Sequence, residues 1–225
     1  SDLRENHGSL FMLAEWEDPA LIDAGFNAVY GWEFHHLLNE LAQGKTDVRA
    51  LARYVEKCDT LWPIETLKMY FTTNHDENTW NGTVSQRMGD LGKAMFVLSS
   101  MMERSLPLVY TGQEAGLNHQ FPFFTKDTIG LDWSTTSADA SFFAEMIALK
   151  HNHVTLSNGV DRHEMALQID TTSNSAMITR GKKGSADQVV AIFQFSDSLP
   201  AYSAPYELEE VVSVKGARVY AAKRD

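Results

Sequence analysis

The sequence has few of the features that mark several other classes of protein. A single cysteine, Cys58, excludes an intrachain disulfide and a cysteine-rich zinc site. Because Cys58 falls on the apolar stripe of an expected helix, we interpret it as a core side chain. No apolar run approaches the roughly 20 residues that a membrane helix needs, and the polar N-terminus has no hydrophobic stretch of a secretion signal. Localisation therefore stays open.

Basic side chains are also scarce. The 19 Lys and Arg residues face 30 Asp and Glu residues, for a formal net charge of -11. This charge repels nucleic-acid phosphates and anionic lipid surfaces, so we expect neither a nucleic acid nor a membrane as a partner. The 44% of hydrophobic residues provides ample core for a globular protein of 225 residues. The chain also begins without methionine, which suggests a piece of a longer protein.

Short apolar runs alternate with amphipathic segments over the first 156 residues. Four such strand-to-helix units in succession predict parallel strands joined by crossover helices, because tight hairpin turns are lacking. The expected strands are 9–16, 27–34, 67–73 and 106–110, and the expected helices follow at 35–44, 47–58, 88–102 and around 142–147. This part is therefore predicted to be α/β.

The pattern changes at about residue 157. Helical periodicity stops, and short β-branched runs alternate with turn sequences that contain glycine. We expect a small antiparallel β-domain over residues 157–225 after an α/β part over residues 1–156.

Acids follow three of the four expected strands, and side chains at the carboxyl ends of parallel strands tend to carry the chemistry. Carboxylates that converge there can cleave a glycosidic bond, one as a proton donor and others as stabilisers of the positively charged sugar. The acids are Glu15, Asp76 with Glu77, and Glu114, while Trp16, Trp32 and Trp80 offer flat faces for sugar rings.

Simpler interpretations compete with these assignments. An acid at a strand end can be a helix cap or a solvated charge, Asn-His-Asp can be a turn, and tryptophans can belong to the core. We interpret His35 and His36 as the start of a helix, not a metal pair. The remaining histidines are expected at the surface: His7, His119, His151, His153 and His163.

Four ordered segments resemble the α-amylase superfamily of glycoside hydrolases. FTTNHDENTWNG at 71–82 resembles that family's conserved Asn-His-Asp segment, and FMLAEWEDP at 11–19 resembles the strand with its general acid. LPLVYTGQEAG at 106–116 and FPFFTKDTIGLDW at 121–133 resemble its eighth strand and the following loop.

The resemblance implies a role for each matching residue. Glu15 matches the general acid and base, Asp76 the transition-state stabiliser, and His75 with Asn74 the residues that bind the same sugar, with Trp16 as a further substrate contact. Glu17 rivals Glu15 on charge alone, but the motif places the acid just before the aromatic residue. For its role Glu15 needs a raised pKa, and we expect burial at the strand end to supply it.

The family's nucleophilic aspartate, in an Arg-x-Asp context on the fourth barrel strand, has no match here. The resemblance therefore implies half of a (β/α)8 TIM-type barrel, strands five to eight, followed by a small antiparallel β-sandwich domain. We expect a fragment of a retaining hydrolase of α-glucans such as starch, inactive alone, that self-associates through its open half-barrel. No cofactor or metal site is evident, and calcium dependence of the parent protein stays open.

Two alternatives remain. The parent can be a transglycosylase or isomerase of the same superfamily, because shared motifs do not decide whether water or a sugar accepts the glycosyl group. The chain can also be a non-catalytic sugar-binding or interaction protein on the same scaffold. In each case the expected ligand is an α-glucan or malto-oligosaccharide.

Overall fold

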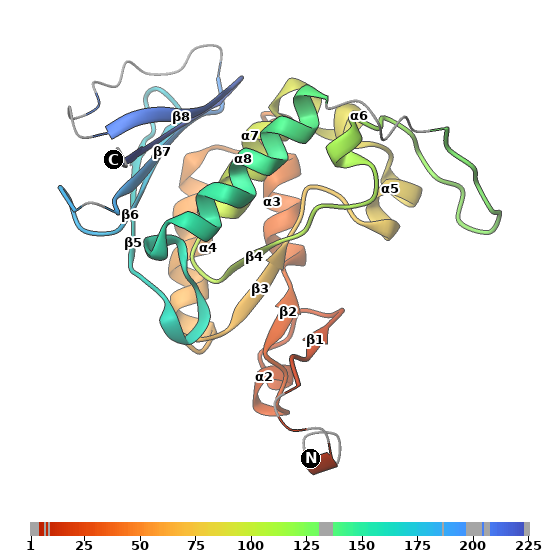
Figure 1. Cartoon of the computed structure of the whole chain (residues 1–225), viewed down its shortest axis with the longest axis horizontal. Helices are drawn as coiled ribbons and strands as arrows, with labels where there is room; N and C mark the ends of the chain where they lie inside the picture. Colours follow the sequence, from red (N-terminus) through yellow and green to blue (C-terminus); the bar gives the residue numbers. More distant parts are fainter. Residues whose placement is uncertain are drawn as a thin grey trace.

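The computed structural model describes residues 5–6, 8, 10–130, 137–185, 187–196, 204 and 208–222. Its first part contains a four-stranded parallel sheet in the order β1-β2-β3-β4, which confirms the predicted α/β class. Figure 1 shows helices α3, α4, α7 and α8 packed around this sheet. The strands are β1 (Leu13–Ala14), β2 (Ala28–Tyr30), β3 (Leu67–Tyr70) and β4 (Ser105–Pro107).

Helices lie between and after these strands near all four expected helical segments, and α2 and α5 are helices that the sequence did not predict. Asp47 caps α4 through a side-chain oxygen that accepts the Arg49 N–H, which explains why that helix begins where it does. The helices are α2 (Ala20–Asp23), α3 (Trp32–Ala42), α4 (Val48–Leu61), α5 (His75–Asn81), α6 (Val84–Met88), α7 (Gly92–Met101) and α8 (Ala138–Asn152), with short 3₁₀ turns η1 (Gly89–Leu91), η2 (Gln113–Ala115), η3 (Val154–Leu156) and η4 (Gly159–Asp161).

The single helix expected over residues 88–102 is wrong. The segment is divided into the end of α6, the turn η1 and α7. Gly89 has a φ of 55°, a left-handed conformation that interrupts a right-handed helix and that glycine adopts at little cost. The apolar spacing survives the break because the residues on both sides of it pack into the same core.

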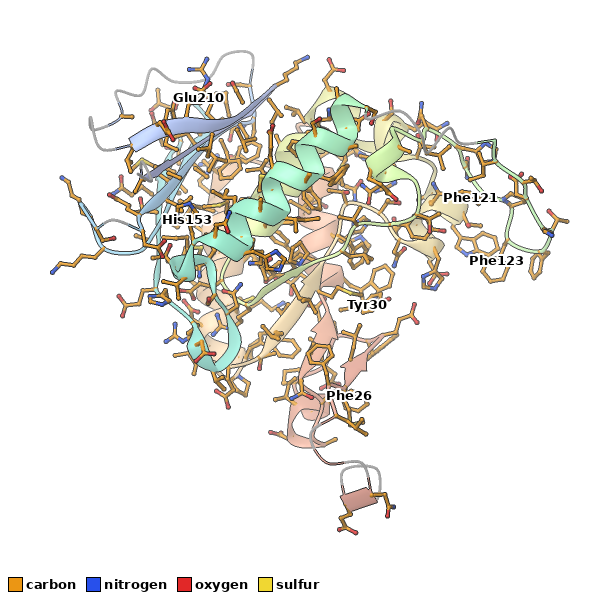
Figure 2. All side chains as sticks on the ribbon, viewed as in Figure 1. Phe26, Tyr30, Phe121, Phe123, His153 and Glu210 are labelled. Carbon is orange, nitrogen blue, oxygen red and sulfur yellow. The ribbon has the colours of Figure 1, made fainter. Side chains whose placement is uncertain are left out.

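The strands are shorter than the apolar runs suggest. The run expected as a strand over 9–16 pairs only at Leu13–Ala14, and the run at 106–110 pairs up to Pro107. The residues that follow each strand leave the ladder and form loops. The segment after η2 runs beside α5 at the edge of the molecule, where Figure 2 labels Phe121 and Phe123.

The second part is a five-stranded antiparallel sheet in the order β5-β6-β7-β9-β8, as expected for the β-domain. Within the described residues it is one sheet, and α7 and α8 of the first part lie against its inner face. Side chains of both parts form one continuous core across the expected boundary at residue 157. The strands are β5 (Met165–Asp170), β6 (Ser175–Arg180), β7 (Val189–Gln194), β8 (Leu208–Val214) and β9 (Ala217–Ala222).

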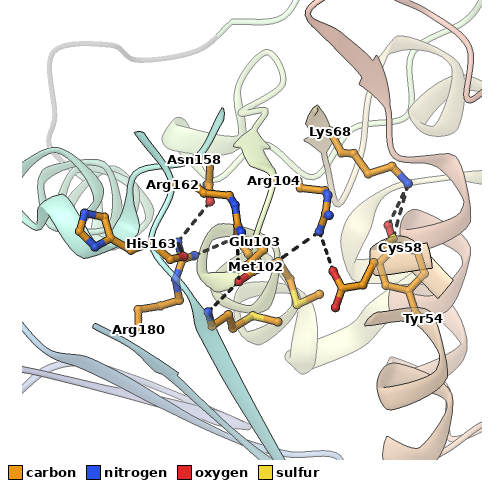
Figure 3. A network of polar contacts seen from close by, with 12 residues as sticks. Tyr54, Cys58, Lys68, Met102, Glu103, Arg104, Asn158, Arg162, His163 and Arg180 are labelled. Atoms are coloured by element: carbon orange, nitrogen blue, oxygen red, sulfur yellow. Dashed lines mark hydrogen bonds and ion pairs between the residues drawn. The ribbon is translucent and has the colours of Figure 1, made fainter. Parts of the chain in front are cut away.

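A buried arginine joins the two parts. Arg180 of β6 is 0% exposed, and its guanidinium donates hydrogen bonds to the backbone oxygens of Met101, Met102, Ser157 and His163 at 3.1–3.2 Å. Figure 3 shows this junction beside the ion pairs of Glu103. The β-sheet is therefore fixed to the end of α7 and to the segment after α8.

Two single residues test the sequence interpretation. Cys58 is buried in the core as expected, and burial raises the pKa of its thiol. His153 was expected at the surface, and this is wrong: it is 5% exposed, with Nδ1 3.1 Å from the Asp187 Oδ1. The partner lies 34 positions along the chain, so local sequence gives no sign of it. No described helix is long and apolar enough to cross a membrane.

Candidate active site

Three polar side chains converge beyond the carboxyl ends of β1 and β3, which lie on either side of β2 in the parallel sheet. Glu15 follows β1 directly, and His75 and Asp76 form the first turn of α5 after β3. The His75 Nε2 lies 3.1 Å from the Glu15 Oε1 and 3.8 Å from the Asp76 Oδ1. One nitrogen or oxygen atom from each residue lies within 4.8 Å of the others. The structure therefore brings together the two acids and the histidine named from the sequence.

Asn74 and a buried ion pair position the helix that carries His75 and Asp76. The Asn74 side chain is 0% exposed and accepts the Glu77 N–H at 2.7 Å, so Asn74 caps α5 from inside the protein. The Glu77 carboxylate lies 2.9 Å from the buried His35 ring, whose Nδ1 lies 3.0 Å from the Phe71 oxygen. Asn74 is therefore a buried residue that positions the helix carrying His75 and Asp76.

The environment of Glu77 has an electrostatic consequence. Burial acts to raise its pKa, but the hydrogen bond and charge of His35, with the charge of Arg87, outweigh burial and lower the pKa below its usual value. Glu77 is therefore held as an anion beside α3. His35 is the fourth residue of α3, which begins at Trp32, and its buried contacts give it a structural role.

Glu17, the alternative candidate for the acid, pairs with Lys68 and lies outside the group of Glu15, His75 and Asp76. Its carboxylate lies 2.7 Å from the Lys68 ammonium, which is fully buried, and accepts the Glu33 N–H at 2.7 Å. The ammonium also lies 4.2 Å from the centre of the Trp62 ring. Glu17 therefore belongs to the layer between sheet and helix, while Glu15 faces the group with His75.

The expected burial of Glu15 is wrong. Its side chain is 50% exposed, and those of His75 and Asp76 are 52% and 40% exposed. The four strands form an open sheet in the described residues, so neighbours surround the group on one side only. The three side chains are accessible to a ligand.

Tyr30 is a site residue that the sequence analysis missed. It ends β2, is 8% exposed, and its ring lies 5.6 Å from that of Phe71. Burial, together with the charges of Glu15 and Asp76, raises its pKa, so the phenol keeps its proton at neutral pH. The one sign that Tyr30 belongs to the site is that it ends β2, the strand between those that lead to Glu15 and to Asp76.

The other candidates occupy different places. Trp16 is 67% exposed and lines a cavity of about 550 Å³ with Trp32 and Trp62, beside Glu17. Trp80 is 58% exposed on α5. Glu114 lies in η2 and is not one of the three clustered residues.

The three clustered side chains can bind a ligand in two ways. Two carboxylates and an imidazole at these distances can bond to neighbouring hydroxyls of one sugar ring, or their atoms can coordinate a cation.

Comparison with known proteins finds solved structures with a similar fold. No protein-family model matches the sequence, and no curated protein matches it. Among solved structures, an Anoxybacillus α-amylase matches with a TM-score of 0.71 and 13% identity, over 100% of this chain and 55% of that one.

Two further α-amylase structures agree. One from Lactobacillus plantarum matches with a TM-score of 0.69 and 18% identity, over 99% of this chain and 56% of that one. A maltogenic α-amylase from Thermotoga neapolitana matches with a TM-score of 0.69 and 16% identity, over 86% and 44%. The chain thus spans about half the length of the structures it resembles. Its parallel sheet with helices and its antiparallel sheet together have the fold of part of an α-amylase.

Proposed function

We propose that the chain carries the general acid and the transition-state stabiliser of a retaining glycoside hydrolase that acts on α-glucans. The observation that carries the proposal is the contact group itself: Glu15, His75 and Asp76 meet at the carboxyl edge of a parallel sheet in an amylase-like fold. Glu17, the competing acid, is held by Lys68.

The roles follow from the chemistry of each group. Glu15 donates its proton to the departing glycosidic oxygen and later accepts a proton from the attacking water. Asp76 accepts hydrogen bonds from hydroxyls of the reacting sugar and stabilises the positive charge that develops on it. His75 lies between the two acids and donates a hydrogen bond to a hydroxyl of the same sugar. Tyr30 lies on β2, between the strands that lead to Glu15 and Asp76.

A retaining reaction also needs a nucleophile about 5–5.5 Å from the acid. Asp76 corresponds to the stabiliser by its motif, and the sequence has no Arg-x-Asp segment in the required position. We propose that a segment outside this chain supplies the nucleophile, and that the chain alone does not hydrolyse starch or malto-oligosaccharides. Hydrolysis by the purified chain, lost in Asp76→Asn, would contradict this and make Asp76 the candidate nucleophile.

The general acid can be tested in the protein that contains the complete barrel. Glu15→Gln is expected to reduce kcat by about two to four orders of magnitude while oligosaccharide affinity is retained, because the amide keeps the shape and loses the transferable proton. Glu17→Gln is the matched control and should keep turnover in the fraction that folds. The reverse result would show that the acid is misassigned.

The same protein separates the two alternatives. A transglycosylase would yield longer or rearranged saccharides when a sugar acceptor is added, while a hydrolase yields shorter ones in water. A non-catalytic binding protein would bind malto-oligosaccharide without releasing any product. Neither the native protein nor Glu15→Gln would then release product.

Association is the physical part of the proposal. Within the described residues β1 and β4 each pair on one side only, so their outer backbone groups are available to another strand. We propose that the isolated chain self-associates through these edges. A stable monomer in a sizing experiment would overturn that part and leave the catalytic assignment untouched.

A further inference from the structure

Three aromatic side chains form an exposed cluster outside the contact group. Trp80 of α5 is 58% exposed, and Phe123 and Phe124 of the loop after η2 are 52% and 86% exposed. The Trp80 ring centre lies 4.9 Å from that of Phe123, and the two phenylalanine centres are 4.8 Å apart. We call these three residues the aromatic platform. Large apolar side chains gathered at a surface mark an interaction site more often than scattered ones do.

Polar contacts hold the loop of the platform against α5. The side-chain amide of Asn78, a residue only 6% exposed, donates to the His119 oxygen at 2.9 Å and accepts the Phe121 N–H at 2.8 Å. The Gln120 side chain donates to the Thr79 oxygen at 2.8 Å. Figure 2 shows Phe121 and Phe123 on this extended segment. The loop is therefore tied to α5 just before Phe123 and Phe124, which reduces the entropy lost when a ligand orders the platform.

The platform continues from the contact group along one helix. Asp76 and Trp80 are four residues apart in α5, so they share a helix face with a rise of about 6 Å between them. A ligand bonded to Asp76 that extends along this face meets the Trp80 ring next. A single sugar unit bonded to Asp76 does not need the platform, whereas a chain of units can reach it.

We propose that Trp80, Phe123 and Phe124 bind glucosyl units of an α-glucan chain beyond the unit held at Asp76, and so favour long oligosaccharides over short ones. This inference rests on the proposed function, because the ligand is taken to start at Asp76 and to extend along α5 from there. The C–H face of a pyranose ring is apolar and carries slight positive charge, so it packs on the negative face of an aromatic ring. The hydroxyls at the ring's edge remain in water.

The surroundings favour a neutral ligand over a charged one. Asp76 lies on the helix of the platform, while on the loop Asp127 is paired with His119 and follows Lys126 in sequence. The net charge of -11 of the whole chain disfavours an anionic lipid or nucleic acid but does not oppose an uncharged sugar. The platform is an open surface, and a polymer laid across it needs no enclosing cavity.

The test compares a short and a long ligand on the 225-residue chain. Isothermal titration with maltose and maltoheptaose is run on the native chain, Trp80→Ala, Phe124→Ala and the control Phe11→Ala, an aromatic residue 57% exposed before β1. Trp80→Ala is expected to weaken maltoheptaose binding about tenfold and leave maltose binding unchanged, because one stacking contact is lost. Phe124→Ala should act in the same direction, Trp80→Phe should restore most of the affinity, and Phe11→Ala should have no effect.

Separate outcomes distinguish this inference from the proposed function. If Trp80→Ala and Phe124→Ala leave maltoheptaose affinity unchanged while Asp76→Asn weakens it, the platform is overturned and the site at Asp76 stands. If the aromatic variants weaken binding but Asp76→Asn does not, the platform stands as a sugar-binding surface and the proposed function loses support. Absence of maltoheptaose binding to the native chain overturns the platform. So does a Trp80→Ala chain that dissociates from oligomer to monomer with unchanged sugar affinity, since the cluster is then a contact between copies.

Discussion

The junction around Arg180 and the group around Glu15 are both polar clusters, yet they are built in opposite ways. Arg180 is 0% exposed, and backbone oxygens from both parts of the chain accept its hydrogen bonds. Glu15, His75 and Asp76 are 40–52% exposed, and His75 lies within 4 Å of both carboxylates. A buried group whose hydrogen bonds join distant segments stabilises the fold, whereas an exposed group with few partners is available to a ligand. The comparison predicts that stability and function depend on different residues.

Arg180→Met is expected to give the largest loss of stability. It removes a buried cation and leaves carbonyl groups of Met101, Met102 and His163 without donors, which costs about 4 kcal/mol or more of unfolding free energy. Urea denaturation followed by circular dichroism measures the loss. The control is Arg49→Met, whose side chain is 63% exposed and whose loss should leave the urea midpoint almost unchanged. Equal effects of the two substitutions would contradict the structural role of the junction.

Glu17→Gln should follow, with a loss of about 3 kcal/mol, because Lys68 is left buried without its counter-charge. The double variant Glu17→Gln with Lys68→Met removes both charges and should recover part of that loss in a double-mutant cycle. Additive losses in the cycle would show that the two side chains do not interact. This prediction sharpens the contrast between Glu17 and Glu15, which are two positions apart in sequence.

Lys150 of α8 makes stability depend on pH. Burial, with a smaller effect of the Arg180 charge, lowers its pKa from 10.5 to about 7. Between these values the unfolded chain holds a proton that the folded chain has released, so this group makes stability rise with pH. From pH 7 to 9 its contribution is about 2 kcal/mol. Urea midpoints measured across this range should rise in the native chain and flatten in Lys150→Met. A native chain whose Lys150 contribution falls with pH would contradict the assignment.

The sequence predicts these two clusters unequally. The expected strand ends predict that Glu15 and the segment 74–78 meet at one edge of the sheet, and the family resemblance then selects Glu15, His75 and Asp76. The cap at Asp47 and the antiparallel strands after residue 157 depend on local patterns in the same way. Arg180, His153 and the pair of Glu17 with Lys68 depend on partners far along the chain, and nothing in their local sequence marks them.

The remaining errors also have physical causes. Apolar spacing continues through Gly89 although the helix does not, because spacing records which face is buried and not the backbone conformation. The exposure of Glu15 depends on what covers the open face of the sheet, which a motif does not record. Tyr30 carries no charge and belongs to no motif, so only its place between β1 and β3 reveals it.

Glu15→Gln is expected to have the smallest effect on stability, within about 0.5 kcal/mol of the native chain. The Glu15 side chain is half exposed, its described ion-pair partner is the exposed His75, and the amide oxygen of glutamine can still accept a hydrogen bond from that ring. Urea denaturation of Glu15→Gln beside Glu17→Gln measures the difference under the same conditions. A loss of stability near that of Glu17→Gln would show that Glu15 supports the fold. The contrast between a stabilising junction at Arg180 and an accessible site at Glu15 would then be wrong. An unchanged urea midpoint, combined with the loss of turnover expected in the protein with the complete barrel, would show that Glu15 acts in the chemistry and not in the stability of the sheet.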